Sequence, residues 1–68
     1  MPVQIIVNGE PRMACEGLTV LGLLRELQID GARVAVELDR HILKQPLWAD
    51  TKLHNGAQLE IVQFVGGG

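Results

Sequence analysis

The chain has 68 residues, enough for one domain, and a chain of this size buries only about 60% of the surface that its unfolded form exposes. Hydrophobic residues make up 47% of the sequence and charged residues 21%, a balance that is typical of a packed domain and argues against intrinsic disorder. The net charge is −2 and the basic residues form no stripe with interleaved aromatics, so nucleic acid is excluded as an expected partner.

The first predicted element is a β-hairpin. Every second residue of "VQIIV" (residues 3–7), starting with Val3, falls on one apolar face of a strand. Asn8-Gly9 follows, and because both residues tolerate positive φ, this pair predicts a tight turn. The expected return strand is "EPRMAC" (residues 10–15), in which Pro11 lacks an N–H and therefore indicates a sheet edge.

A helix is predicted next, because the spacing of the apolar residues changes. Thr19 is a suitable N-cap, and Leu18 before it stands where a hydrophobic staple onto the helix would form. Gly22 is less favourable than alanine inside a helix by about 1 kcal/mol, and the sequence offers no reason for it. Asp30-Gly31 is expected to end the helix. The residues at i, i+3, i+4 and i+7 of the apolar face are Val20, Leu23, Leu24 and Leu27.

The sequence after the helix predicts a second pair of strands. "RVAVELD" (residues 33–39) alternates, with its valines and leucine inward and Glu37 and Asp39 outward. "HIL" (residues 41–43) is expected to add a short fourth strand. These residues extend the sheet beyond the first hairpin.

An irregular or single-turn segment is expected before the last strand. Pro46 interrupts the preceding element, and Trp48 is the expected anchor of this segment in the core. Asn55-Gly56 predicts another turn, and "AQLEIVQFV" (residues 57–65) is the last strand. On that strand Leu59 and Ile61 would face the helix.

This order of elements predicts an α+β fold, in which one helix packs on a mixed sheet. If the last strand lies beside the first, the two are parallel, and the topology is the β-grasp, the ubiquitin-like fold. We expect a single domain over residues 1–68, with four to five strands and a flexible glycine tail at residues 65–68.

The expected location is the cytoplasm. No apolar run approaches the roughly 20 residues of a membrane span, and the start "MPVQIIVNGE" does not have the pattern of a signal peptide. A single cysteine, Cys15, leaves no internal disulfide framework and fits a reducing compartment.

Few side chains suggest chemistry of their own. A lone strand cysteine is more often a small buried hydrophobe than a nucleophile, so we expect Cys15 in the core. His41 and His54 lie far apart, without carboxylate or cysteine at metal spacing, and are expected on the surface. An iron–sulfur cluster needs about four thiolates and is excluded. No metal site is predicted.

The outward residues of the later strands have two interpretations. Glu37, Asp39 and Glu60 are ordinary solvated carboxylates, or they help to dock a basic partner. Val62 and Phe64 fall on the face away from the helix, as secondary packing or as an apolar patch that contacts a partner.

The chain ends in "QFVGGG", and the three glycines are the most distinctive feature. A phosphate-binding loop needs a helix after its glycines, and none follows Gly68. From Val65 onward an extended chain reaches roughly 13 Å, at about 3.3 Å per residue. Without Cβ atoms it can enter a narrow slot and deliver a carboxylate that a separate enzyme activates. The alternative is an inert frayed end.

Several stretches that cover nearly the whole chain form a distinctive set. Their order and spacing, with the glycines at the end, resemble the ThiS family, the ubiquitin-like sulfur carriers of thiamine biosynthesis. The stretches are "VNGE" (residues 7–10), "TVLGLLRELQI" (19–29), "VAVELD" (34–39), "LWADTKLHNGAQLEIV" (47–62) and "FVGGG" (64–68).

The resemblance implies a β-grasp carrier that is not itself an enzyme and binds no cofactor. A ubiquitin-activating-type enzyme, ThiF in this pathway, would adenylate the carboxylate of Gly68 with ATP and Mg²⁺. Sulfur that comes ultimately from cysteine, through a donor such as a cysteine desulfurase system, would give a thiocarboxylate. Thiazole synthase (ThiG) would take that sulfur for the thiazole. Gly67 would provide the slender approach and Gly66 would lengthen the tether.

The departures from the family pattern leave the partners open. Members often have Asp where this chain has Ala57, Asn near Asp39, and a Val-Pro-Arg-like stretch near residues 43–45. A related carrier for molybdopterin or for transfer-RNA thiolation, which also modifies proteins, would use the same tail. A ubiquitin-like binding module with an inert tail is the alternative from another class, and an enzyme based on Cys15 is a third.

Overall fold

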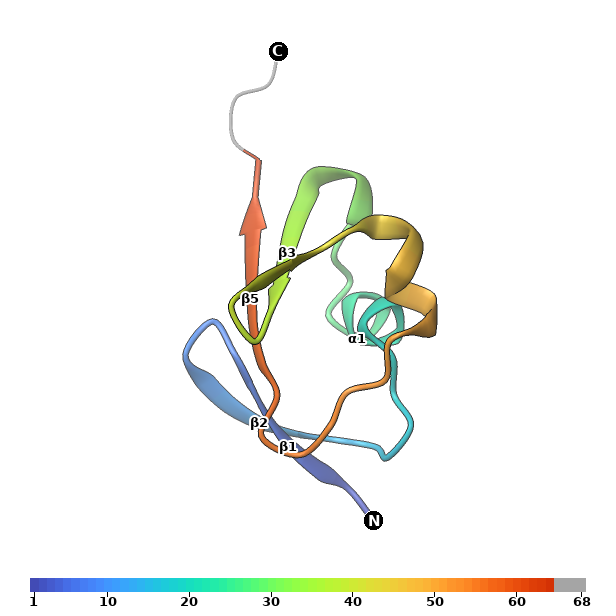
Figure 1. Cartoon of the computed structure of the whole chain (residues 1–68), viewed down its shortest axis with the longest axis vertical. Helices are drawn as coiled ribbons and strands as arrows, with labels where there is room; N and C mark the ends of the chain where they lie inside the picture. The colour runs from blue at the N-terminus through green and yellow to red at the C-terminus, as the bar shows by residue number, and fades with distance from the viewer. Residues whose placement is uncertain (65–68) are drawn as a thin grey trace.

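The structure is a computed structural model that describes residues 1–64. Within them a five-stranded sheet has the strand order β2-β1-β5-β3-β4 (Figure 1). The strands are β1 (Val3–Val7), β2 (Glu10–Ala14), β3 (Val34–Leu38), β4 (His41–Leu43) and β5 (Gln58–Gln63). The helical elements are α1 (Val20–Glu26) and the 3₁₀ helices η1 (Gly31–Arg33) and η2 (Gln45–Asp50).

The first and last strands pair at the centre of the sheet. β1 and β5 are parallel, with Ile6 opposite Gln58 and Val7 opposite Leu59. The other three strand pairs are antiparallel. The predicted β-grasp is therefore confirmed, and the sheet has five strands, the upper end of the expected range.

The first hairpin turns where the sequence predicts it. Asn8 and Gly9 have φ values of 51° and 84°, as a tight two-residue turn requires. Pro11 lies on β2, which is an edge strand, so its missing N–H leaves no unpaired ladder position. The side chain of Asn8, just after β1, extends the pairing between β1 and β5. Its Oδ1 accepts from the Ile61 N–H at 2.7 Å, and its Nδ2 donates to the Ile61 carbonyl at 3.2 Å.

Helix α1 begins as predicted, and the structure supplies a reason for Gly22. Thr19 caps the helix, with its Oγ1 accepting from the Gly22 N–H at 3.1 Å. A Cβ placed on Gly22 would lie 2.8 Å from Cδ1 of Leu18, the half-buried residue just before the cap. Glycine therefore makes room for Leu18 to fold back over the first turn.

The predicted helix end at Asp30-Gly31 is wrong, because α1 stops at Glu26. Gln28 adopts a left-handed conformation, with φ of 58°. Its N–H donates to the Arg25 carbonyl at 3.1 Å, and the Ile29 N–H donates to the Leu24 carbonyl at 2.9 Å, which is the Schellman pattern of a helix end. Asp30 has a separate role, since its Oδ1 caps η1 through the Ala32 N–H.

The core lies between one face of the sheet and the layer formed by α1 and η2 (Figure 1). Trp48 of η2 is 3% exposed, and its Nε1 donates to the Leu43 carbonyl at 2.8 Å, so the expected anchor is confirmed. None of the helices within residues 1–64 covers the opposite face of the sheet (Figure 1). The buried apolar residues are Ile5, Ala14, Val20, Leu23, Leu24, Val34, Val36, Trp48, Leu53, Ala57 and Leu59.

The predicted core position of Cys15 is wrong. Strand β2 ends one residue earlier, at Ala14, which stands opposite Val3 and is 5% exposed. Because side chains alternate across a strand, Ala14 takes the inward position and Cys15 is exposed beyond the strand.

The helical elements are all short. Among residues 1–64, none has the length and apolar character that crossing a lipid bilayer requires.

Candidate functional site

The candidate site is the end of β5 and the sheet face beside it. Val65, Gly66, Gly67 and Gly68, which sequence analysis identifies as the reactive tail, lie outside the described residues. The last anchor before them is Phe64, whose N–H donates to the Arg33 carbonyl at 2.8 Å.

β5 has a paired strand on each side. Towards β1, the Ile6 N–H donates to the Ala57 carbonyl at 2.9 Å and the Asn8 N–H donates to the Leu59 carbonyl at 2.8 Å. Towards β3 the antiparallel pairing extends from Leu59 to Gln63. The strand that leads into the tail is therefore paired with a neighbouring strand on each side.

Val62 and Phe64 are exposed, as the alternation along the last strand predicts. Leu59 is 1% exposed and Ile61 is half-buried, whereas Val62 is 54% and Phe64 is 60% exposed. The structure thus excludes secondary packing within residues 1–64 as the role of these two side chains. Their contact with a partner stays a prediction.

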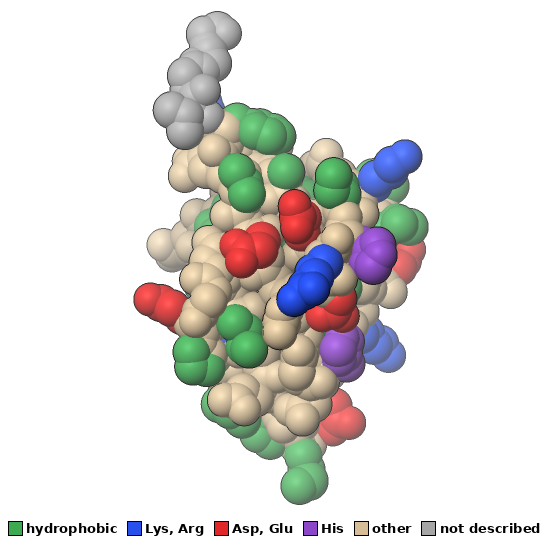
Figure 2. All heavy atoms as spheres, turned by 60° about the vertical axis from the view of Figure 1, so that its left-hand side comes forward, with side chains coloured by type: hydrophobic (Ala, Val, Ile, Leu, Met, Phe, Trp, Pro, Cys, Tyr) green, Lys and Arg blue, Asp and Glu red, His purple; other side chains and the backbone are tan. Residues whose placement is uncertain are grey.

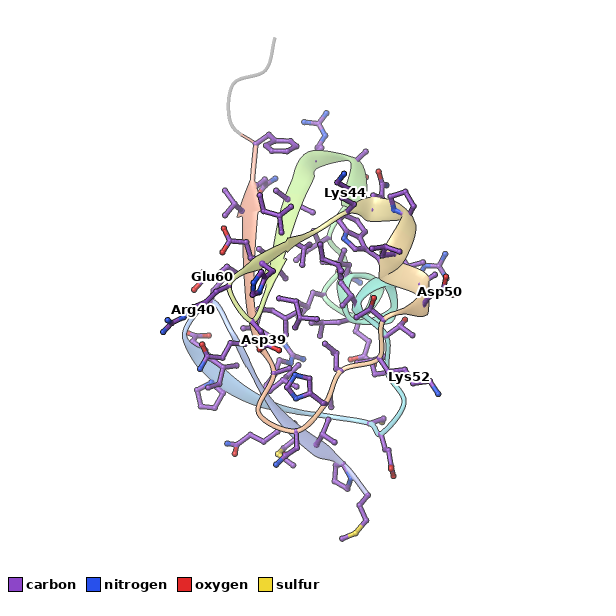
Figure 3. All side chains as sticks on the ribbon, in the orientation of Figure 1. Asp39, Arg40, Lys44, Asp50, Lys52 and Glu60 are labelled. Carbon is purple, nitrogen blue, oxygen red and sulfur yellow. The ribbon has the colours of Figure 1, made fainter. Side chains whose placement is uncertain are left out.

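The three outward carboxylates fall into two groups. Glu37 on β3 stands directly opposite Glu60 on β5, so these two belong together on the helix-free face of the sheet. Asp39 instead lies in the turn after β3 (Figure 3), where its Oδ1 accepts from the Gln58 N–H at 3.0 Å. Asp39 thus has hydrogen-bond partners within the fold, whereas the two glutamates lie on the helix-free face, where Glu60 is exposed and Glu37 is half-buried.

Sequence analysis missed a contact between Asp39 and His54. The two side chains meet at 2.8 Å between Oδ2 and Nε2, although 15 residues separate them in the chain. The backbone hydrogen bond from Gln58 and then the contact with His54 lower the pKa of Asp39. The hydrogen bond to Asp39 and, to a smaller extent, the hydrogen bond to the Asn55 carbonyl raise the pKa of His54. The pair ties the β3–β4 turn to the loop before β5.

One groove on the described part of the surface has a volume of about 530 Å³ and lies between the end of α1 and β5, with Leu27, Ile29 and Ile61 among its lining residues. Asp30 is its only ionisable lining residue within residues 1–64. No three His, Cys, Asp or Glu side chains in this part of the chain are grouped as a metal ion requires.

The predicted surface position of both histidines is confirmed. His54 and His41 are exposed, and the Nδ1 of His41 lies 3.0 Å from the carbonyl oxygen of Asp39. What the arrangement offers chemically is a firmly held strand, an exposed face next to its end, and the tail that follows in the sequence.

The comparisons with known proteins agree with this architecture. A sequence model described as the ThiS family matches residues 4–68. The crystal structure of a thiamine biosynthesis protein (ThiS) from Geobacter metallireducens has a TM-score of 0.84, with 32% identity, over 97% of this chain and 100% of that chain. The sulfur carrier protein ThiS of Escherichia coli is 29% identical over 97% of this chain and 100% of its own length.

A second kind of relative is much longer than this chain. A thiazole synthase from Paramagnetospirillum magneticum is 39% identical over 97% of this chain, but the match spans only 20% of that protein. The family match covers the sheet, the helix and the tail residues together. The chain therefore belongs to the ThiS family, the ubiquitin-like sulfur carriers of thiamine biosynthesis.

Proposed function

We propose that this chain carries sulfur for the thiazole of thiamine as a thiocarboxylate on Gly68. The observation that supports the proposal most is the central position of β5, with its pairing to both neighbours, immediately before the glycines. A carrier needs a tail that a partner can pull into an active site without unfolding the domain. A strand fixed on both sides resists that pull.

The chemistry requires an activating partner. A carboxylate oxygen of Gly68 attacks the α-phosphorus of ATP, and pyrophosphate leaves, with Mg²⁺ held by an adenylating enzyme of the ThiF type. The terminal sulfur of a persulfide on a cysteine desulfurase system then attacks the acyl carbon, and AMP leaves with one carboxylate oxygen. A thiol reductant attacks the other sulfur of the resulting acyl disulfide, which releases the thiocarboxylate and leaves the thiol in a disulfide with the sulfur donor. One oxygen of Gly68 is thereby replaced by sulfur. The carrier itself binds no nucleotide and catalyses no step.

The glycines at 66 and 67 suit this role because they have no Cβ. A side chain at either position would widen the segment that has to enter the partner's active site. Val65 and Phe64, just before them, are the first residues at which a side chain could contact the rim of that site.

The acceptor in this proposal is a thiazole synthase (ThiG). The similarity of this chain to one fifth of the Paramagnetospirillum thiazole synthase supports a functional link between carrier and synthase. We place the reaction in the cytoplasm, where ATP is available and an exposed thiol such as Cys15 stays reduced.

Intact-mass spectrometry tests the proposal. After incubation with the adenylating enzyme, ATP, Mg²⁺ and a sulfur source, the mass of the chain should rise by one oxygen-to-sulfur exchange at Gly68. The purified product should then support thiazole formation by the synthase. A variant that carries one alanine after Gly68 is the control, and it should fold normally but gain no sulfur. The absence of any exchange with an enzyme that adenylates a related carrier would refute the proposal.

A further inference from the structure

We propose that the helix-free face of the sheet binds an arginine of the partner between Glu37 and Glu60, inside a rim of exposed apolar side chains. The inference rests on the proposed function, since the partner in question is the adenylating enzyme that receives the tail. It adds to that function a recognition surface of defined chemistry.

The two glutamates are brought together by the pairing of β3 and β5. Glu37 and Glu60 are directly opposite each other in the antiparallel register, a position in which Cβ atoms are about 4.5–5.5 Å apart. Their side chains point to the same face, because residues opposite each other across a ladder share a face. The next strand contributes Ile42, which stands opposite Glu37 on β4.

This arrangement is unfavourable for the isolated domain. Like charges directly opposite each other destabilise a sheet, and neither glutamate is joined to a cation by any ion pair within residues 1–64. Arg40, in the turn after β3, is the nearest cation in sequence to Glu37 (Figure 3) and forms no such ion pair with either carboxylate. A cation supplied from outside would relieve the repulsion between the two carboxylates.

The apolar surroundings favour a protein side chain over a free ion. Ile42 is 75% exposed, Val62 is 54% exposed and Phe64 is 60% exposed. Figure 2 shows acidic and hydrophobic side chains on the face of the molecule below the grey segment, with a basic side chain beside the acidic ones. A partner that covers these apolar groups also removes water from the glutamates, and charge-assisted hydrogen bonds are stronger in such an environment.

Arginine matches this site better than lysine. Its planar guanidinium presents five N–H donors in a fixed fork, and it is less strongly hydrated than an ammonium group. One guanidinium can therefore donate to both carboxylates while its flat face lies on Ile42, which stands beside Glu37. Aromatic and arginine side chains are also enriched at the centres of protein interfaces.

The position of the face points to the tail's own enzyme as the occupant. Glu60, Val62 and Phe64 are successive same-face residues of the strand that runs directly into residues 65–68. A protein that takes Gly68 into its active site is held within four residues of Phe64. It must therefore cover or closely approach this face.

The test is a binding measurement with a charge-matched control. In the double variant Glu37→Gln/Glu60→Gln, the Kd for the adenylating enzyme should rise about tenfold or more, since loss of buried charge pairs at interfaces weakens binding strongly. The control Glu10→Gln/Glu26→Gln makes the same change in net charge, on β2 and on α1, away from the open face. Its Kd should stay within about twofold of the wild-type value.

Three further measurements separate recognition from folding and from chemistry. The Glu37→Gln/Glu60→Gln variant should unfold at the same temperature as the wild type or at a higher one, because a repulsion has been removed. Raising the salt concentration should weaken the wild-type complex more than the complex of this variant. At saturating enzyme, the variant should still acquire sulfur on Gly68.

An unchanged Kd for this double variant, or equal losses in both double variants, would overturn the arginine site. Wild-type sulfur transfer in the same preparation would then leave the proposed function standing. Failure of the wild-type chain to bind the adenylating enzyme at all would overturn the arginine site as well.

Discussion

The contact between Asp39 and His54 is the clearest titratable feature at the scale of single residues. Both side chains are about half exposed, at 45% and 58%, so solvent screens their attraction. A surface pair of this kind contributes about 0.2–1 kcal/mol to the free energy of unfolding. It nevertheless closes the loop before β5 onto the β3–β4 turn.

The sign of the pH dependence follows from the two pKa directions. The raised pKa of His54 gives a stabilisation that is complete below the unfolded pKa and is lost as the pH rises through the folded value. The lowered pKa of Asp39 gives a stabilisation present above its unfolded pKa and lost as the pH falls through the folded value. The pair is therefore most stabilising between these limits, at about pH 5–6.

His54→Gln should accordingly lower the unfolding free energy more at about pH 5.5 than at about pH 8.5. Urea unfolding of the variant and the wild type at both pH values measures this difference. His41→Gln is the comparison and should show a smaller difference, because the His41 ring bonds to the backbone carbonyl of Asp39 and is the weakest of the groups that lower the pKa of the Asp39 carboxyl. The same loss at both pH values would show that His54 acts through packing rather than charge.

The turns show which local structures can be predicted from the sequence and which cannot. Asn8-Gly9 and Asn55-Gly56 are recognisable turn pairs, and both were predicted. Asp39-Arg40 has positive φ at both positions, 52° and 71°, yet neither residue is glycine, so its two-residue turn was not predicted. Its geometry depends on the pairing of β3 with β4 and on the bond from Asp39 to Gln58.

At the scale of elements, α1 depends on a fit between its cap and its first turn. Gly22→Ala in an exposed helix would normally raise stability by about 1 kcal/mol. In this helix the new methyl group would meet Cδ1 of Leu18 at 2.8 Å. The usual gain should therefore be offset by displacement of the Leu18 side chain.

A double-mutant cycle measures this coupling. Gly22→Ala alone should give little or no increase in the unfolding free energy, whereas in a Leu18→Ala background it should add about 1 kcal/mol. Chemical denaturation of the four proteins gives the interaction term. The same increment in both backgrounds would show that Leu18 is not the reason for Gly22.

The sequence predicts the strands and the helix largely correctly, but it does not predict where α1 and β2 end. The start of α1 follows from Thr19 and the apolar spacing, which are local signals. Its end depends on Gln28, a residue that ordinarily avoids positive φ and is held there by hydrogen bonds to the helix. The exposure of Cys15 likewise depends on where β2 stops, one residue earlier than the predicted strand.

At the scale of the whole molecule, the two faces of the sheet have different roles. One face holds the core under α1 and η2, and the other carries Val62, Phe64 and the paired glutamates. Sequence analysis identified each of these residues as outward-facing. The partnership of Glu37 with Glu60 requires the register between β3 and β5, which connects residues distant in the chain and leaves no local pattern.

Phe64→Ala should weaken binding to the adenylating enzyme without lowering stability. The side chain is 60% exposed, so truncation leaves no cavity in the core, while an aromatic side chain near the tail is expected to contribute to the interface. Leu47→Ala is the control, because Leu47 is 51% exposed on η2, which belongs to the helical layer. We expect a several-fold rise in Kd for the first variant and none for the second, measured by titration calorimetry.

Equal effects of the two substitutions on Kd would show that the enzyme does not distinguish the open face from the helical side. A fall in thermal stability for Phe64→Ala would instead identify Phe64 as part of the folded core. Neither outcome is compatible with the surface described here.

The central place of β5 also has a consequence for how the chain is made. Within residues 1–64, in the order β2-β1-β5-β3-β4, β5 is the strand that connects the two hairpins, and it leaves the ribosome after the other four strands. A nascent chain that has not yet exposed residues 58–63 holds two separate hairpins, and an isolated hairpin is marginally stable in water. Completion of the sheet therefore has to wait until residues 58–63 have been synthesised, and products truncated before them lack the strand that joins the two hairpins.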